Sequence, residues 1–168
     1  MSTILNTNGS SLQIPEINPN VEGDFYIFTA DWNPKITYAL RDAAFRVLRN
    51  AGIEKSRIHS LSVPGTVELV NAAGVAMNAR NDEGASPAAI IIIGCVIRGD
   101  TPHFDYVCRI AAQGTADLNA KGETPVIFGV LTVDNEQQAL DRAGGSLGNK
   151  GAEAAVAAVT MANLSLEL

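Results

Sequence analysis

The run AAIIIIGCVI at residues 88–97 constrains the fold more than any other segment. It is nearly continuous in isoleucine and valine, and it lacks the polar–apolar alternation of a strand with one face in water. A strand of this kind is covered on both faces, as in a parallel sheet between two layers of helices. We therefore predict that residues 88–97 form a central strand of a parallel sheet.

Three more strands and several helices are predicted around this one. Ile36, Leu40, Ala43 and Val47 belong to one apolar stripe with the spacing of a helix. Strands are expected at 25–30, 58–63 and 126–133, and helices at 67–77, 107–118, 136–143 and 151–164. Alternation of strands and helices implies right-handed crossovers. The fold class expected is α/β, with a central four-stranded parallel sheet and helices on both faces.

Composition limits the classes of protein to consider. The chain has 168 residues, of which 46% are hydrophobic, enough for one domain with a proper core. Its net charge of −6 gives no electrostatic footprint for nucleic acid or an anionic membrane, so neither is an expected partner. The longest apolar runs, such as Ala88–Ile93, are far short of the ~20 residues that span a bilayer. Residues 1–20 do not resemble a signal peptide, and we expect a soluble, cytoplasmic protein.

Residues 1–23 and 24–168 are expected to differ in organisation. The first segment is polar, contains Pro15 and Pro19, and resembles an arm that needs a partner surface. The second has no internal repeat or linker and is expected to be a single domain. Cys95 and Cys108 match no zinc-binding spacing and are interpreted as two buried thiols, so no metal site is expected.

Unusual side chains follow the ends of the predicted strands. The first strand runs into Trp32-Asn33-Pro34, the second into the segment 64–68 (PGTVE) and the third into 98–106 (RGDTPHFDY). In an open parallel sheet, ligands bind outside the carboxyl ends of the strands. Aromatic, imidazole, hydroxyl and carboxylate groups therefore converge on one rim, where we expect the functional site.

The third of these segments is the most informative, yet it leaves two interpretations open. Asp100–Pro102 is expected to start a helix, whose free N–H groups would bind an anion. His103, one turn in, could transfer protons near neutral pH. A helix cap followed by a surface histidine explains the segment equally well.

Other candidates also have a plain structural interpretation. Glu68 is either a partner of the helix dipole or an acceptor of hydrogen bonds from a ligand. Trp32 by itself would more often be a packing residue than a stacking one. Arg142 and Lys150 flank a glycine-rich turn, which a solvated connection between helices explains, so a phosphate contact there needs a second reason.

Three segments, however, resemble one enzyme family. Residues 63–69 (VPGTVEL), 94–107 (GCVIRGDTPHFDYV) and 129–155 (GVLTVDNEQQALDRAGGSLGNKGAEAA) closely resemble 6,7-dimethyl-8-ribityllumazine synthase. The resemblance implies a flavodoxin-like three-layer α/β sandwich. It also implies condensation of 5-amino-6-(D-ribitylamino)uracil with 3,4-dihydroxy-2-butanone 4-phosphate, the penultimate step of riboflavin biosynthesis, with no metal or organic cofactor.

The resemblance assigns roles to individual residues. His103 matches the proton-transfer residue and Trp32 the aromatic ring that stacks on the pyrimidine. Contacts to the ribityl chain and the heterocycle are implied for Thr66, Val67, Glu68, Val96 and Ile97. Phosphate binding is implied for Asp100, Thr101 and Arg142. Phe128 matches an aromatic that closes the pocket from a neighbouring subunit, and Lys150 a cation near the ligands.

The resemblance further implies a homo-oligomer. It suggests a ring of five subunits with shared active sites, in which the arm extends the sheet of a neighbour. The short turn 142–151 has the glycine-rich form of relatives that assemble twelve pentamers into an icosahedral shell. Association with riboflavin synthase is a further partner that the resemblance suggests. The rival interpretations are a non-catalytic flavin-binding or shell protein and a nucleotide-binding protein, although the sequence has no GxGxxG or Walker pattern.

Overall fold

The structure, a computed structural model that describes residues 12–168, is built on one parallel sheet of four strands. The strands are β1 (Phe25–Ala30), β2 (Ile58–Val63), β3 (Ala89–Ile97) and β4 (Val126–Val133), in the spatial order β2-β1-β3-β4. All three neighbouring pairs are parallel. β3 therefore lies inside the sheet, as its uninterrupted apolar sequence predicts.

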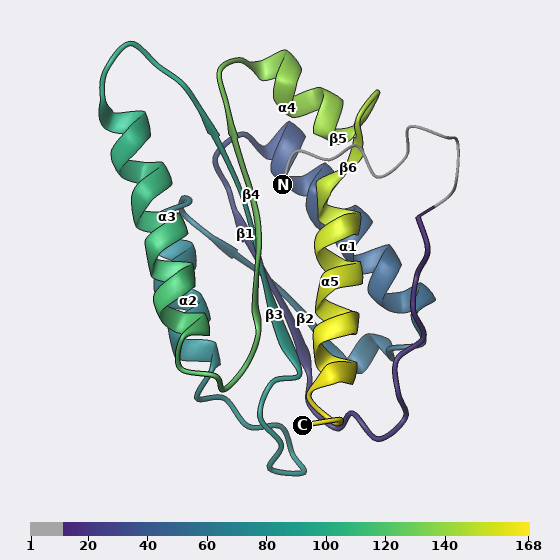
Figure 1. Ribbon diagram of the computed structural model, residues 1–168. Coiled ribbons are helices and arrows are strands. Elements are labelled where there is room, and N and C mark those ends of the chain that lie inside the picture. The colour runs from purple at the N-terminus through teal and green to yellow at the C-terminus, as the bar shows by residue number, and fades with distance from the viewer. Residues whose placement is uncertain (1–11) are drawn as a thin grey trace.

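Helices cover both faces of the sheet (Figure 1). One layer contains α1 (Pro34–Asn50) and α5 (Lys150–Leu164), and the other contains α2 (Glu68–Ala76) and α3 (His103–Asn119). The short α4 (Glu136–Arg142) lies near the carboxyl end of β4. This is the three-layer flavodoxin-like α/β fold expected from the sequence.

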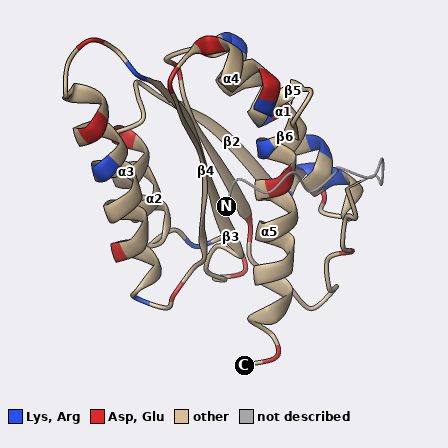
Figure 2. Cartoon of the chain, turned by 45° about the horizontal axis from the view of Figure 1, so that its top comes forward, with Lys and Arg blue, Asp and Glu red and all other residues tan. Residues whose placement is uncertain are grey.

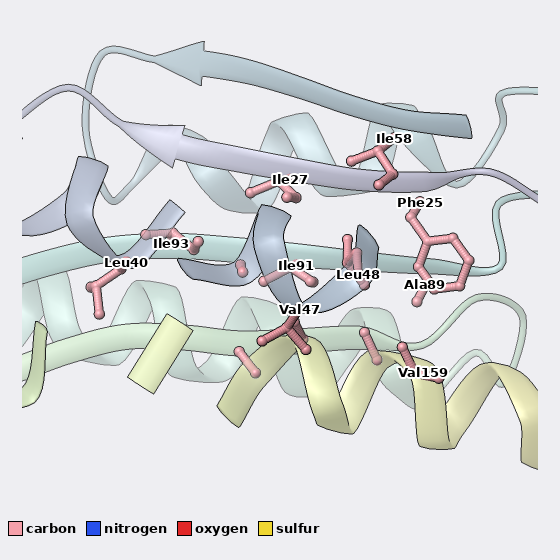
Figure 3. Close-up of a cluster of buried hydrophobic side chains, with 14 of the residues drawn as sticks. Phe25, Ile27, Leu40, Val47, Leu48, Ile58, Ala89, Ile91, Ile93 and Val159 are labelled. Atoms are coloured by element: carbon pink, nitrogen blue, oxygen red, sulfur yellow. The ribbon is translucent and has the colours of Figure 1, made fainter. Parts of the chain in front are cut away.

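The larger core lies between the sheet and the layer of α1 and α5. Figure 3 shows Ile27, Ile91 and Ile93 of the strands facing Leu40 of α1 and Val159 of α5. These side chains are almost entirely excluded from water. Burial of one such side chain stabilises a protein by about 1.5–3 kcal/mol, so this face supplies much of the folding free energy.

The second core lies on the opposite face, where Ile90 and Ile92 of β3 contact Leu69 of α2 and Leu118 of α3. None of the four strands contains a Lys, Arg, Asp or Glu. Figure 2 accordingly shows charged residues on helices and loops while the strands stay uncoloured. Charged side chains therefore lie on the helices and loops around the sheet and beyond the ends of its strands.

The predicted elements are confirmed, with differences at their ends. α3 begins at His103, so His103 is the first residue of the helix rather than one turn inside it. Pro102 explains the difference, because the residue before a proline is disfavoured in the helical region. A small antiparallel hairpin, β5 (Ala143–Gly145) with β6 (Gly148–Asn149), occupies the glycine-rich turn, and a 3₁₀ turn, η1 (Lys55–Arg57), precedes β2.

The arm partly departs from expectation, because its described part lies on its own chain. Ile17 donates its amide hydrogen to Ala51 O at 2.8 Å and packs on the larger core. Asn163 of α5 accepts from the amide of Asn18 and donates to Glu16 O, both at 2.9 Å. The described part of this segment therefore has partners within its own chain, while residues 1–11 lie outside the described part.

Candidate active site

A cleft of about 420 Å³ opens at the carboxyl ends of β1 and β3. This is the point where the strand order reverses, since β2 follows β1 on one side and β3 joins β1 on the other. Ligands of open α/β sheets bind at such a switch point. The cleft is lined by Trp32, Asn33, Gly65, Thr66, Val67, Glu68, Cys95, Val96, Ile97, His103 and Val107.

The turn after β1 presents Trp32 to this cleft. Asn33 has a left-handed backbone (φ 59°), and its carbonyl accepts hydrogen bonds from the amides of Ile36 and Thr37 at the start of α1. Its side-chain amide donates to Cys95 O at 3.0 Å, which ties the turn to β3. Trp32 is 73% exposed, so its ring is not held in the core of this chain.

The turn after β2 places a hydroxyl and a carboxylate in the cleft. A Cβ atom on Gly65 would lie 3.0 Å from Glu68 Oε2 and 3.5 Å from Trp32 Cδ1. The absence of a side chain at Gly65 therefore lets both groups approach the same backbone. Thr66 is buried and Glu68 is exposed as the first residue of α2.

The third wall comes from β3 and α3. Val96 and Ile97 are half-buried at the end of the strand, and His103 is exposed at the start of α3. Asp100 and Thr101 are exposed in the connection between these elements, and they do not line the cleft. His103 is therefore the residue that brings a titratable ring to this wall.

Three predicted site residues lie in a different place. Phe128, Arg142 and Lys150 line a second cleft of about 530 Å³ along β4 and α5. β4 is an edge strand, and Phe128 on it is 40% exposed. The Lys150 ammonium lies 2.7 Å from a carboxylate oxygen of Glu153, which also lines this cleft. The two clefts share no residue in the single chain.

The two cysteines differ in burial. Burial raises the pKa of the Cys95 thiol to about 11, so it stays protonated at neutral pH. Cys95 is buried as expected, whereas Cys108 on α3 is only half-buried.

Within residues 12–168, no group of three or more His, Cys, Asp or Glu could hold a metal ion, and no helix is long and apolar enough to cross a membrane.

Several residues that line these clefts are not assigned to the site from the sequence. Asn33 could have been found from its place between Trp32 and a proline suited to the first turn of a helix. Glu153 stands three residues after Lys150 on α5, the spacing of a helical ion pair. No sequence pattern around Gly65, Cys95 or Val107 predicts a binding site. These residues line the cleft because of how the strands and helices pack.

Comparison with known proteins decides the family. The model of the family 6,7-dimethyl-8-ribityllumazine synthase matches residues 23–165. The chain belongs to this family. The match covers all four strands of the sheet and all five helices that the preceding paragraphs describe.

Curated relatives support the same family. A 6,7-dimethyl-8-ribityllumazine synthase of Bacteroides fragilis is 50% identical over 82% of this chain and 92% of its own length. One of Cytophaga hutchinsonii is 45% identical over 93% of both chains. A third, of Phocaeicola vulgatus, is 45% identical over 89% of this chain and 87% of its own length. The similarity therefore extends over nearly the whole folded domain.

Proposed function

We propose that this chain condenses 5-amino-6-(D-ribitylamino)uracil with 3,4-dihydroxy-2-butanone 4-phosphate to give 6,7-dimethyl-8-ribityllumazine, phosphate and water. The observation that carries the proposal is the family match over residues 23–165. The cleft at the switch point supports it, because Trp32, Glu68 and His103 supply a flat ring, a carboxylate and a titratable imidazole there.

The pyrimidine substrate occupies the first cleft in this proposal. Trp32 stacks on its ring, while Val96 and Ile97 contact the heterocycle at the end of β3. Glu68 accepts hydrogen bonds from the ribityl hydroxyls, and Thr66 and Val67 line the chain. The half-buried apolar wall and the exposed carboxylate suit a ligand that is flat at one end and hydroxylated at the other.

The anionic substrate binds at Asp100 and Thr101, next to the start of α3, with Arg142 as its charged partner. Free N–H groups at a helix start favour an anion, and a guanidinium can bind phosphate through two hydrogen bonds. The reaction then proceeds by imine formation between the amino group and the ketone, elimination of phosphate, ring closure and loss of water. His103 transfers the protons, and holding two substrates together supplies much of the remaining acceleration.

We further propose that the complete site is formed by two neighbouring chains in a pentamer. Phe128, Arg142 and Lys150 line a cleft separate from that of Trp32 and His103, which suits a site shared across an interface. Val75 on α2 and Tyr106 on α3 are strongly exposed, which also favours a partner surface. α5 adds no support, because its alanines are buried against its own chain.

Assembly of twelve pentamers into an icosahedral shell is the larger form of this proposal, and riboflavin synthase is the partner that such a shell would enclose. The compact hairpin of β5 and β6 supports the shell, since it keeps the turn between α4 and α5 short. The two free cysteines favour a reducing, cytoplasmic location. Light scattering of untagged protein should give a species much larger than five chains of 17.6 kDa. Free pentamers alone would contradict the shell and leave the ring intact.

The enzyme proposal is tested by mixing purified protein with both substrates and following lumazine absorbance and released phosphate. We expect both products in equal amounts. His103→Ala should be slower by about 10²–10⁴-fold but still active, as for loss of a general acid–base. Binding of the product without any acceleration would favour the non-catalytic alternative.

A further inference from the structure

Arg98 joins two elements at the edge of the candidate site. It follows β3, and its amide donates to Val133 O at 2.8 Å, which extends the pairing of β3 and β4 by one bond. Its Nε donates to Asp134 Oδ1 at 3.1 Å, just beyond the end of β4. Its Nη1 donates to Asp105 Oδ1 at 3.4 Å, in the first turn of α3.

The guanidinium also covers a ring. Its central carbon lies 4.1 Å from the centroid of the Phe104 ring, and Phe104 is almost fully buried under it. The hydrogen bond to Asp134 raises the pKa of Arg98, so the group remains a cation. One side chain thus holds two carboxylates and an aromatic ring that belong to the end of β4 and to α3.

Little else among the described residues holds the connection between these elements. No side chain caps the N-terminus of α3, and a Cβ atom on Gly99 would meet nothing within 4 Å. Within the connection, the amide of Asp105 donates to Pro102 O at 3.0 Å. The contacts of Arg98 are therefore the side-chain contacts that tie the first turn of α3 to the end of β4.

His103 directly precedes Phe104 and Asp105, the two residues of α3 that Arg98 contacts. We propose that Arg98 is a positioning residue, whose guanidinium fork fixes the first turn of α3 and thereby sets His103 and the turn at Asp100–Thr101. Lysine is no substitute, because a point charge cannot stack on the ring and donate in two fixed directions at once. This inference rests on the proposed function and adds a residue that itself does not line the cleft.

Kinetics of Arg98→Ala and Arg98→Lys test the inference, with Arg109→Ala as the matched control. Arg109 is an exposed arginine on the same helix. Both Arg98 variants should lose about 10- to 100-fold in kcat/KM, as for a small displacement of reacting groups, with KM rising more for the butanone phosphate than for the pyrimidine. Arg109→Ala should behave as the unchanged protein, and the unfolding temperature should stay close in all three. Full activity of Arg98→Lys would overturn the inference, as would equal kinetics of Arg98→Ala and Arg109→Ala.

A second measurement does not depend on catalysis. The chain has two histidines, and His59 lies on β2, paired with Asp24 at 2.7 Å. We expect Arg98→Ala to change the rate at which diethyl pyrocarbonate modifies His103 and to leave the rate at His59 unchanged, as read by peptide mass spectrometry. An unchanged rate at His103 would overturn the inference. If the unaltered protein makes no lumazine, the proposed function fails while this readout still decides the role of Arg98.

Discussion

Trp32 carries the clearest residue-scale signal of a ligand. Sequence alone favours packing for a single tryptophan, but the structure leaves 73% of its surface exposed beside a cleft. Removing the apolar surface of an indole from water is favourable. Because Trp32 is not covered by its own chain, this gain requires another molecule to cover the ring. Stacking on a flat substrate satisfies that requirement.

We predict that Trp32→Phe keeps activity and that Trp32→Ala raises KM for the pyrimidine by about tenfold. The reason is that an aromatic pair contributes about 0.5–1.5 kcal/mol beyond the area it buries. Steady-state kinetics with the pyrimidine varied would measure the change. An unaltered KM in the alanine variant would return Trp32 to a packing role at an interface.

For Arg142 we predict a substrate-specific effect. Its Nη1 donates to Gln138 O at 2.9 Å on its own helix, which holds the side chain at the second cleft. Arg142→Ala should weaken use of the butanone phosphate by about 1.5–3 kcal/mol, the usual cost of a lost charged hydrogen bond. KM for the pyrimidine should change little. Equal effects on both substrates would remove Arg142 from the phosphate site.

At the scale of elements, the contact of α2 with β3 sets the shape of the first cleft. A Cβ atom on Gly94 would lie 2.8 Å from Thr66 Oγ1 and 3.1 Å from Leu69 Cδ1. Leu69 is fully buried and has little room to move, so an added methyl group would crowd Thr66, which lines the cleft. Gly94 thus fixes how closely α2 approaches the sheet.

Gly94→Ala should therefore lower the free energy of unfolding by about 1–3 kcal/mol, the usual cost of overpacking, and raise KM for the pyrimidine. Gly74→Ala on α2 is the matched control, because its Cβ would meet Leu118 Cδ2 at an ordinary 3.5 Å. The control should gain about 0.5–1 kcal/mol from higher helix propensity. Denaturant unfolding of both variants measures this, and equal stabilities would contradict the packing argument.

The elements themselves were largely predictable from the sequence. Strand positions followed from apolar runs such as 88–97, and helix positions from a 3.6-residue period. The hairpin of β5 and β6 was not predictable, because strands of two and three residues in a glycine-rich segment carry no period. The predicted start of α3 lies too early, because Pro102 disfavours the helical region at Thr101 and the helix begins at His103.

The site was predictable only in part. Side chains that follow β1, β2 and β3 meet at one cleft because the carboxyl ends of parallel strands lie at one edge. The separate position of Phe128 and Lys150 depends on how α5 packs beside β4, which no local pattern reveals.

At the scale of the whole molecule, the proposed division of the site between two chains is the central feature. One cleft has the aromatic ring, the carboxylate and the imidazole, and the other has the arginine and the lysine. A heterologous contact that repeats around a closed ring would bring the second cleft of each subunit to the first cleft of its neighbour. Each chain would then contribute to two active sites.

Mixed oligomers test this claim most directly. Glu68→Ala changes the first cleft and Arg142→Ala the second, and each variant alone should have little activity. If sites are shared, co-assembly of equal amounts gives about a quarter of interfaces with two unaltered halves, so activity should return to about a quarter of the unaltered level. If both clefts of one chain served one site, every site in the mixture would carry a defect. Activity of the mixed oligomers no higher than the mean of the two variants would contradict the account.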